Sequence, residues 1–356
     1  MNMPDRNEIA PKPKRKSLVD LSKEGHRLLK ANQYEEARAV FAEALILDPS
    51  NPYILTGMGD VLRAQKKLAT AEDCYRQVLD REPDNPFALR GLGDTFRDRE
   101  QFDRALVMWE RYLRVRPDDI YVLTRIADAS KMLGRFETAE SVYRKILALR
   151  PADRYSLMGL ADLYHKFGRE SQAIENYEKV LAYDPRMINI LTILGNLYRR
   201  RGDLDRAKGC YDRVLQQDSN NPYALYGLGE ICRWQRDYRG AIALWEQILE
   251  HSEGTIGMLS RLGDAYRNLD ELATAERIYR QILDQGYDRY ALLGLSKLRF
   301  QQDRFPEALA LFEDFLRREG EELRVTEELQ RLIDQLRSDG MVPAQLLELL
   351  ERYKQD

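Results

Sequence analysis

Cysteine and histidine are scarce in this sequence of 356 residues, with three of each. No Cys-x-x-Cys pair, phosphate-binding glycine loop or nucleophile elbow occurs. No apolar run resembles a membrane span or the core of a secretory signal. The net charge is only −3 although 32% of the residues are charged, so the overall basic charge of a nucleic-acid-binding domain is missing.

These absences argue against an enzyme, a metal or cofactor, membrane insertion and a nucleic-acid partner. The scattered thiols favour a cytoplasmic protein.

The sequence does contain one pattern, which repeats nine times between Leu18 and Glu322 with a period of 34 residues that shortens to 33 in the last step. We call residues at equivalent positions of the repeats a row. A row of small residues consists of Gly25, Gly59, Gly93, Ala127, Ala161, Gly195, Gly229, Gly263 and Ser296. An alanine row follows twelve positions later, at Ala37, Ala71, Ala105, Ala139, Ala173, Ala207, Ala241, Ala275 and Ala308. The core aromatic row comes four positions after that, at Phe41, Tyr75, Trp109, Tyr143, Tyr177, Tyr211, Trp245, Tyr279 and Phe312.

The spacing predicts two amphipathic helices in each repeat, A and B. Alanine, aromatic and a following leucine are four residues apart in the second half, which puts them on one stripe of helix B. Small residues on both helices let the two backbones approach, and we expect the aromatic to fill the space between repeats. Ser296 and Arg299 replace commoner residue types in the ninth repeat, so we expect that repeat to be irregular.

This pattern resembles the tetratricopeptide repeat (TPR) family. The resemblance implies an all-α fold, a right-handed superhelical solenoid of nine TPR helix pairs over residues 18–322, whose A helices line a concave groove. Residues 1–17, with the run Lys12–Lys16, are expected to form a disordered basic tail. Apolar spacing in residues 323–356 predicts helices that cap the last repeat.

Two charged rows lie where the resemblance places the groove. The acid row consists of Asp60, Asp94, Asp128, Asp162, Asn196, Glu230 and Asp264, and the base row, three residues later, of Arg63, Arg97, Lys131, His165, Arg199, Arg233 and Arg267. An acid and a base three residues apart are neighbours on a helix. These ladders either bind a charged partner segment or only neutralise each other and stiffen the solenoid.

Aromatic and amide side chains add further candidate binding residues. An outer aromatic row precedes the acid row by seven residues and consists of Tyr53, Phe87, Tyr121, Tyr155, Tyr223 and Tyr290. The seventh repeat adds Tyr226 and Trp234, and Asn189 and Asn196 in the sixth repeat could bond to a peptide backbone. Aromatic side chains are favoured interface anchors, although packing against the preceding helix B would also explain the outer row.

The sequence therefore favours a non-enzymatic scaffold that binds a protein or peptide in a mixed-charge groove. One alternative is a self-assembling structural protein, a homo-oligomer whose groove receives the next copy. Another is an RNA-binding helical repeat, which the acid row disfavours. The clamp that some TPR proteins use for a chaperone's C-terminal carboxylate is not expected in the first repeats, where Asp60 and Asp94 would repel it.

Overall fold

A computed structural model describes residues 17–319, and every regular element in that range is an α-helix. The expected tail, apart from Ser17, and the expected cap at residues 323–356 lie outside the described residues. The chain forms two compact units, Met1–Tyr183 and Asp184–Asp356, which we describe separately.

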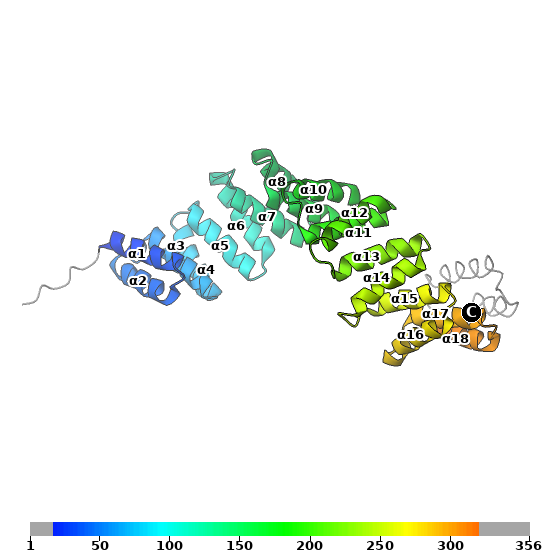
Figure 1. The fold of residues 1–356 in the computed structure, drawn as a ribbon. Coiled ribbons are helices and arrows are strands. Elements are labelled where there is room, and N and C mark those ends of the chain that lie inside the picture. Colours follow the sequence, from blue (N-terminus) through cyan, green and yellow to red (C-terminus); the bar gives the residue numbers. More distant parts are fainter. Residues whose placement is uncertain (1–16, 320–356) are drawn as a thin grey trace, which may run out of the picture. The chain divides into compact units, whose positions relative to one another are not determined.

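Helices in both units alternate between A (odd labels) and B (even labels), and each A helix packs along its own B helix (Figure 1). The first unit contains α1 (Leu18–Lys30), α2 (Tyr34–Leu47), α3 (Pro52–Ala64), α4 (Leu68–Leu79), α5 (Pro86–Asp98), α6 (Phe102–Val115), α7 (Ile120–Met132), α8 (Phe136–Leu149), α9 (Arg154–Lys166) and α10 (Glu170–Tyr183). The second contains α11 (Ile188–Arg200), α12 (Leu204–Leu215), α13 (Pro222–Trp234), α14 (Tyr238–Leu249), α15 (Ile256–Asn268), α16 (Leu272–Gln285), α17 (Arg289–Gln301) and α18 (Phe305–Glu319).

Side-chain caps define where most A helices begin. In α3 the Asn51 side chain accepts hydrogen bonds from the backbone N–H groups of Tyr53 and Ile54, at 3.1 and 3.3 Å. Pro52 occupies the first turn, where the missing N–H costs nothing. Asn85, Asp119, Asp153 and Asn221 cap their helices in the same way.

The turn from helix A to helix B takes a left-handed residue in all nine described repeats. Glycine occupies this position in three repeats, at Gly134, Gly168 and Gly202, with φ angles of 74°, 71° and 79°. The other six repeats force a side-chain-bearing residue into the same conformation, at Asn32, Lys66, Glu100, Arg236, Asp270 and Asp303. Asn32, Asp270 and Asp303 are of residue types that adopt this conformation comparatively readily. At Lys66, Glu100 and Arg236 the Cβ makes it costly, so the repeat geometry dictates the turn there against local preference.

The predicted rows form the core. Every member of the alanine row is 0% exposed, and every member of the core aromatic row is at most 1% exposed. Where the small residue is glycine, the aromatic ring of the same repeat lies directly against it; a Cβ added at Gly195, for example, would lie 2.5 Å from the Tyr211 ring. The alanine and aromatic assignments are therefore confirmed.

A second glycine row, which the sequence reasoning missed, lies on the opposite side of these rings. It consists of Gly57, Gly91, Gly159, Gly227 and Gly294. A Cβ at Gly227 would lie 2.3 Å from the Tyr211 ring, and one at Gly91 equally close to the Tyr75 ring. Rings such as those of Tyr75 and Tyr211 therefore lie between their own A helix and the next one, with a glycine on each side.

The ninth repeat is regular, contrary to the sequence expectation. Ser296 is buried and donates to the carbonyl of Ala308 at 2.9 Å, which satisfies its hydroxyl between α17 and α18. Arg299 is 2% exposed and pairs with Glu276 at 2.6 Å and Glu307 at 3.2 Å. A buried polar group is tolerated when its bonds are made, so these substitutions leave the helix pair intact.

Successive A helices pack on one another at α1–α3, α3–α5, α7–α9, α11–α13 and α15–α17. Among the described residues of either unit, no two successive B helices approach as closely. The face of each unit that its A helices form, which we call the A side, is therefore the inner side of the helix stack.

Candidate binding surface on the A helices

The acid row is tied to the core aromatic row in every described repeat that has a tyrosine there. The tyrosine hydroxyl donates to the acid-row residue of its own repeat, at 2.7 Å in Tyr75–Asp60, Tyr177–Asp162 and Tyr279–Asp264, at 2.8 Å in Tyr211–Asn196, and also in Tyr143–Asp128. Burial raises the pKa of Tyr75 well above its ordinary value, and the adjacent Asp60 adds to the effect, so this hydroxyl stays protonated and donates. The four aspartates and Asn196 thus satisfy buried hydroxyl groups, a structural role that the charge pattern alone did not reveal.

Two repeats carry a tryptophan in that row and pair the acid differently. Trp109 and Trp245 have no hydroxyl to offer Asp94 and Glu230, which are 3% and 1% exposed. Arginines from the next A helix pair with these acids instead. Arg125 pairs with Asp94, and Arg261 lies 3.1 Å from Glu230.

Arg125 and Arg261 occupy glycine-row positions, each in the repeat that follows a tryptophan. The arginine Cβ prevents the close approach that glycine allows. Accordingly α5 and α7, and likewise α13 and α15, pack less closely than the other successive A helices within a unit. The pairing of tryptophan with the following arginine is visible in the sequence and could have located these positions.

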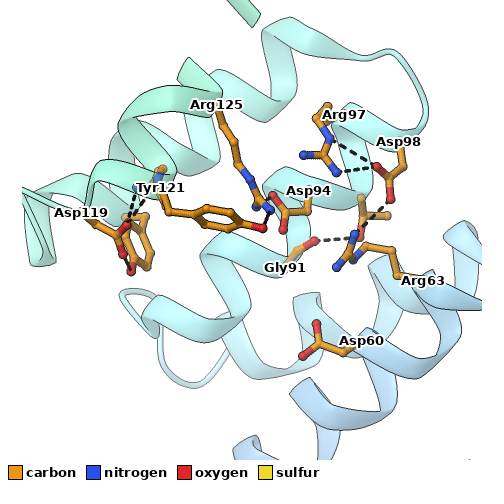
Figure 2. Close-up of polar contacts among 12 residues, drawn as sticks. Asp60, Arg63, Gly91, Asp94, Arg97, Asp98, Asp119, Tyr121 and Arg125 are labelled. Atoms are coloured by element: carbon orange, nitrogen blue, oxygen red, sulfur yellow. Dashed lines mark hydrogen bonds and ion pairs between the residues drawn. The ribbon is translucent and has the colours of Figure 1, made fainter. Parts of the chain in front are cut away.

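The first arginine set lies in the second to fourth repeats (Figure 2). Arg63 and Arg97 both bond to Asp98, at 3.1 and 2.9 Å, while Arg125 reaches from α7 to Asp94 and to the Tyr121 hydroxyl. Burial would raise the pKa of Asp98, but the hydrogen bonds from Arg97 and Arg63 outweigh it and hold that pKa below its usual value. Desolvation, with repulsion from Arg63 and Arg90, lowers the pKa of Arg125 to about 10.

The second arginine set lies in the sixth to eighth repeats and is centred on Glu230. The carboxylate of Glu230 is 3.1 Å from Arg233, 3.1 Å from Arg261 and 3.9 Å from Arg199. Desolvation and repulsion from Arg199 lower the pKa of Arg261. The guanidinium of Arg199 lies 5.7 Å from the centre of the Trp234 ring, at a cation–π distance.

The remaining ladder residues form weaker contacts. Lys131 lies 4.0 Å from Asp162 of the next repeat, and Arg267 lies 3.8 Å from Asp264 of its own. Within the described repeats, acid-to-base pairs three residues apart form between these two rows only in the seventh and eighth. His165 stacks edge-on against Tyr177. Many side chains of the charged rows therefore form ion pairs, hydrogen bonds or ring contacts with other residues of the protein.

The predicted aromatic and amide residues differ in accessibility. Tyr223 is 70% and Trp234 44% exposed, whereas Tyr226 is half-buried. Asn196 is committed to the Tyr211 hydroxyl, while Asn189 is exposed near the start of α11. The other members of the outer aromatic row are also exposed, so packing against the preceding helix B does not bury them.

Two cavities open beside these residues, one in each unit. A cavity of about 700 Å³ in the first unit is bordered by Arg97, Tyr121, Arg125, Asp128 and Tyr155. A cavity of about 520 Å³ in the second is lined mainly by apolar groups, among them Tyr223, Tyr226, Ile248 and Met258. Each adjoins an A helix that carries an arginine in the glycine row.

Residues 17–319 offer neither a metal site nor a membrane span. No cluster of three or more histidine, cysteine, aspartate or glutamate side chains suitable for a metal occurs in that range. None of its helices combines the length and apolar character that crossing a membrane requires.

Comparisons with known proteins agree with this architecture. A profile described as tetratricopeptide repeat matches residues 22–86, 56–120, 90–154, 124–187, 194–253 and 260–321. No curated protein matches the chain.

Solved structures similar to this chain include the C-terminal part of a TPR repeat-containing protein from Cytophaga hutchinsonii, at 17% identity and a TM-score of 0.58, which covers 67% of this chain and 98% of that one. PilW, a type IV pilus biogenesis factor, is 18% identical with a TM-score of 0.49 and covers 58% and 96%. MamA is 23% identical with a TM-score of 0.44 and covers 47% and 92%. Because the profile matches extend over more than half of the sequence, the chain belongs to the tetratricopeptide repeat family.

Proposed function

We propose that this protein is a non-enzymatic scaffold that binds an extended segment of a partner protein along its A helices. The observation that carries this proposal is the exposure of the outer aromatic row. Each member is the second residue of its A helix, and the exposed fraction runs from 44% for Phe87 to 70% for Tyr223. Large aromatic side chains at six equivalent positions thus remain accessible to a partner, even though Tyr121 also contacts Arg125 and Tyr155 donates to Asp128.

The A side suits such a partner for two further reasons. It is the inner side of the stack in each unit, so neighbouring repeats present their aromatic residues to the same ligand. Exposed tyrosine supplies a large contact area with few rotatable bonds, which makes it a favoured anchor. Contacts repeated along a chain also reinforce one another, because each contact raises the local concentration for the next.

The test is a selection of random displayed peptides on the purified full-length protein. Enriched peptides are then measured by fluorescence anisotropy against wild type and a variant with four outer aromatic residues truncated: Tyr53→Ala, Phe87→Ala, Tyr223→Ala and Tyr290→Ala. Interface truncations at anchors cost about 2 kcal/mol or more each, so we expect the variant to lose measurable binding. Circular dichroism should show unchanged helix content, since all four side chains are exposed.

A matched control truncates four exposed apolar residues on B helices: Ile46→Ala, Val107→Ala, Val115→Ala and Leu149→Ala. This control should bind the peptides as wild type does. Failure of wild type to enrich any peptide, or full binding by the aromatic variant, would remove the basis for the proposal.

A further inference from the structure

The arginines that surround a buried acid occur twice in this chain, four repeats apart. Arg63, Arg97 and Arg125 of the first set correspond to Arg199, Arg233 and Arg261 of the second. In both sets the arginines pair with acids of a tryptophan repeat, which are Asp94 and Asp98 in the first set and Glu230 in the second. Everything that distinguishes the two sets must therefore come from the residues around the arginines.

The first set is neutralised by its own carboxylates. Asp98 forms ion pairs with Arg63 and Arg97 at 3.1 and 2.9 Å, and Asp94 forms one with Arg125. Asp60, in the same face of α3, accepts the Tyr75 hydroxyl. Each guanidinium directly contacts an acid, and two carboxylates serve three arginines.

The second set keeps its three arginines and loses two of those acids. Asn196 stands at the position of Asp60, and Trp234 at the position of Asp98. Among the described residues, the ion pairs of all three guanidinium groups go to Glu230, and Asp264 adds a longer-range attraction for Arg261. The Arg199 side chain is 16% exposed, and its Nε, like that of Arg63 in the first set, is buried without a hydrogen-bond partner in the described residues. The first set also has Arg90 nearby, which Tyr226 replaces in the second set.

We propose that this second set, which we call the arginine clasp (Arg199, Arg233 and Arg261 around Glu230), binds an acidic side chain of a partner protein segment. The inference rests on the proposed function and specifies the partner's chemistry. One carboxylate cannot satisfy the donors of three guanidinium groups, each of which has five N–H bonds. Arg233 and Arg261 are 32% and 41% exposed, so an incoming carboxylate can reach both, in the forked geometry that guanidinium groups favour.

The adjoining cavity adds an apolar requirement. Its lining includes Tyr223, Tyr226, Ile248 and Met258, and the Arg261 guanidinium lies 5.6 Å from the centre of the Tyr226 ring. The clasp and the cavity thus share Tyr226. The segment that fits both places an apolar side chain in the cavity and an acidic side chain close to it in the clasp.

A nucleic-acid strand fits this surface less well. A phosphate backbone requires a continuous basic track. Here the clasp is bordered by Asp264 in the neighbouring repeat and by Glu253 at the rim of the cavity. The positive charge is local and matches one or two carboxylates.

The experiment restores the missing acids. The variant Asn196→Asp with Trp234→Asp installs in the clasp the carboxylates that the first set already has. We expect the second set to accommodate both carboxylates as the first set does. In the first set Asp60 accepts a tyrosine hydroxyl, as Asn196 does in the second, and Asp98 pairs with two arginines. The control variant, Lys208→Ser with Ala243→Asp, makes the same change in net charge at exposed positions of α12 and α14.

The probes are a fluorescein-labelled peptide of alternating glutamate and leucine, its glutamine and leucine counterpart, and a labelled oligouridylate, measured by anisotropy at physiological salt. We expect wild type and control to bind the acidic peptide and the restored-acid variant to bind it about tenfold more weakly or worse, the equivalent of one charge-assisted hydrogen bond. Should that variant fold poorly, Arg261→Gln provides the same test, because Arg233 still pairs with Glu230.

Equal binding of the two peptides, undiminished binding by the variants, no binding of the acidic peptide, or preference for oligouridylate would each overturn the inference. The proposed function would survive these results if displayed peptides are enriched on wild type and lost on truncation of the outer aromatic row.

Discussion

Replacing Gly227 with alanine tests the claim that the Tyr211 ring lies in close contact with two A helices, against Gly195 on one side and Gly227 on the other. The added methyl would lie 2.3 Å from Cζ and 2.6 Å from Cε2 of Tyr211, well inside van der Waals contact. The ring cannot withdraw, because it is fully buried and its hydroxyl is held by Asn196 at 2.8 Å. Overpacking of this kind costs roughly 1–3 kcal/mol, and alanine returns about 0.5–1 kcal/mol of helix propensity. The two terms together should lower the free energy of unfolding by at most about 2 kcal/mol.

Gly209 offers the matched control in the same unit. It lies inside α12, and a methyl group there meets no atom within 4 Å, so Gly209→Ala should stabilise by about 0.5–1 kcal/mol. Because repeat arrays can unfold in parts, urea melts followed by circular dichroism should be paired with hydrogen exchange of peptides from α12 and α13. A Gly227→Ala protein as stable as the Gly209→Ala protein would refute the packing argument.

Three further predictions concern the first unit. Arg125→Met leaves buried Asp94 without its partner and should destabilise by about 3–5 kcal/mol, measured by urea unfolding with Trp109 fluorescence; adding Asp94→Asn should recover part of the loss, and no recovery would contradict the pairing. Glu100→Gly should stabilise by roughly 0.5–1 kcal/mol, because Glu100 has a φ of 59° that glycine adopts freely, whereas Glu100→Ala should bring no such gain in the same melt. Folding lowers the pKa of Asp98, so the ionised Asp98 side chain stabilises the fold above its unfolded pKa of about 4, and this stabilisation is lost as the pH falls through the lower folded pKa. Asp98→Asn should therefore flatten the acid limb of a stability–pH profile. An unchanged limb would count against the role of Asp98.

Much of the fold follows from the repeat alone. The alanine and core aromatic rows were assigned correctly because a stripe of small and large apolar residues at helical spacing has one stable solution, burial against the neighbouring helix. Glycine marks the left-handed turn in only three repeats, at Gly134, Gly168 and Gly202. At Lys66 or Glu100 the residue type gives no local signal, because the surrounding helix pairs impose the conformation.

The candidate site was harder to predict because its decisive contacts join different helices. Tyr177 and Asp162 are fifteen residues apart in sequence, and helical spacing within one helix says nothing about that hydrogen bond. The charge pattern therefore left two interpretations, partner binding or mutual neutralisation, and neither included the hydrogen bonds by which much of the acid row satisfies buried tyrosine hydroxyl groups. One signal for these contacts was available in the sequence. Where tryptophan replaces tyrosine in the core aromatic row, arginine replaces glycine in the next repeat, at Trp109–Arg125 and Trp245–Arg261.

Site-specific photo-crosslinking tests the central claim most directly. A photoreactive phenylalanine derivative replaces Tyr223 on the A side or, in a second protein, Ala243 on the exposed surface of α14, and each is irradiated with a peptide selected on wild type. The account predicts crosslinks from position 223 and none above background from position 243. Crosslinking from position 243 alone would place the partner on the B helices and contradict the account.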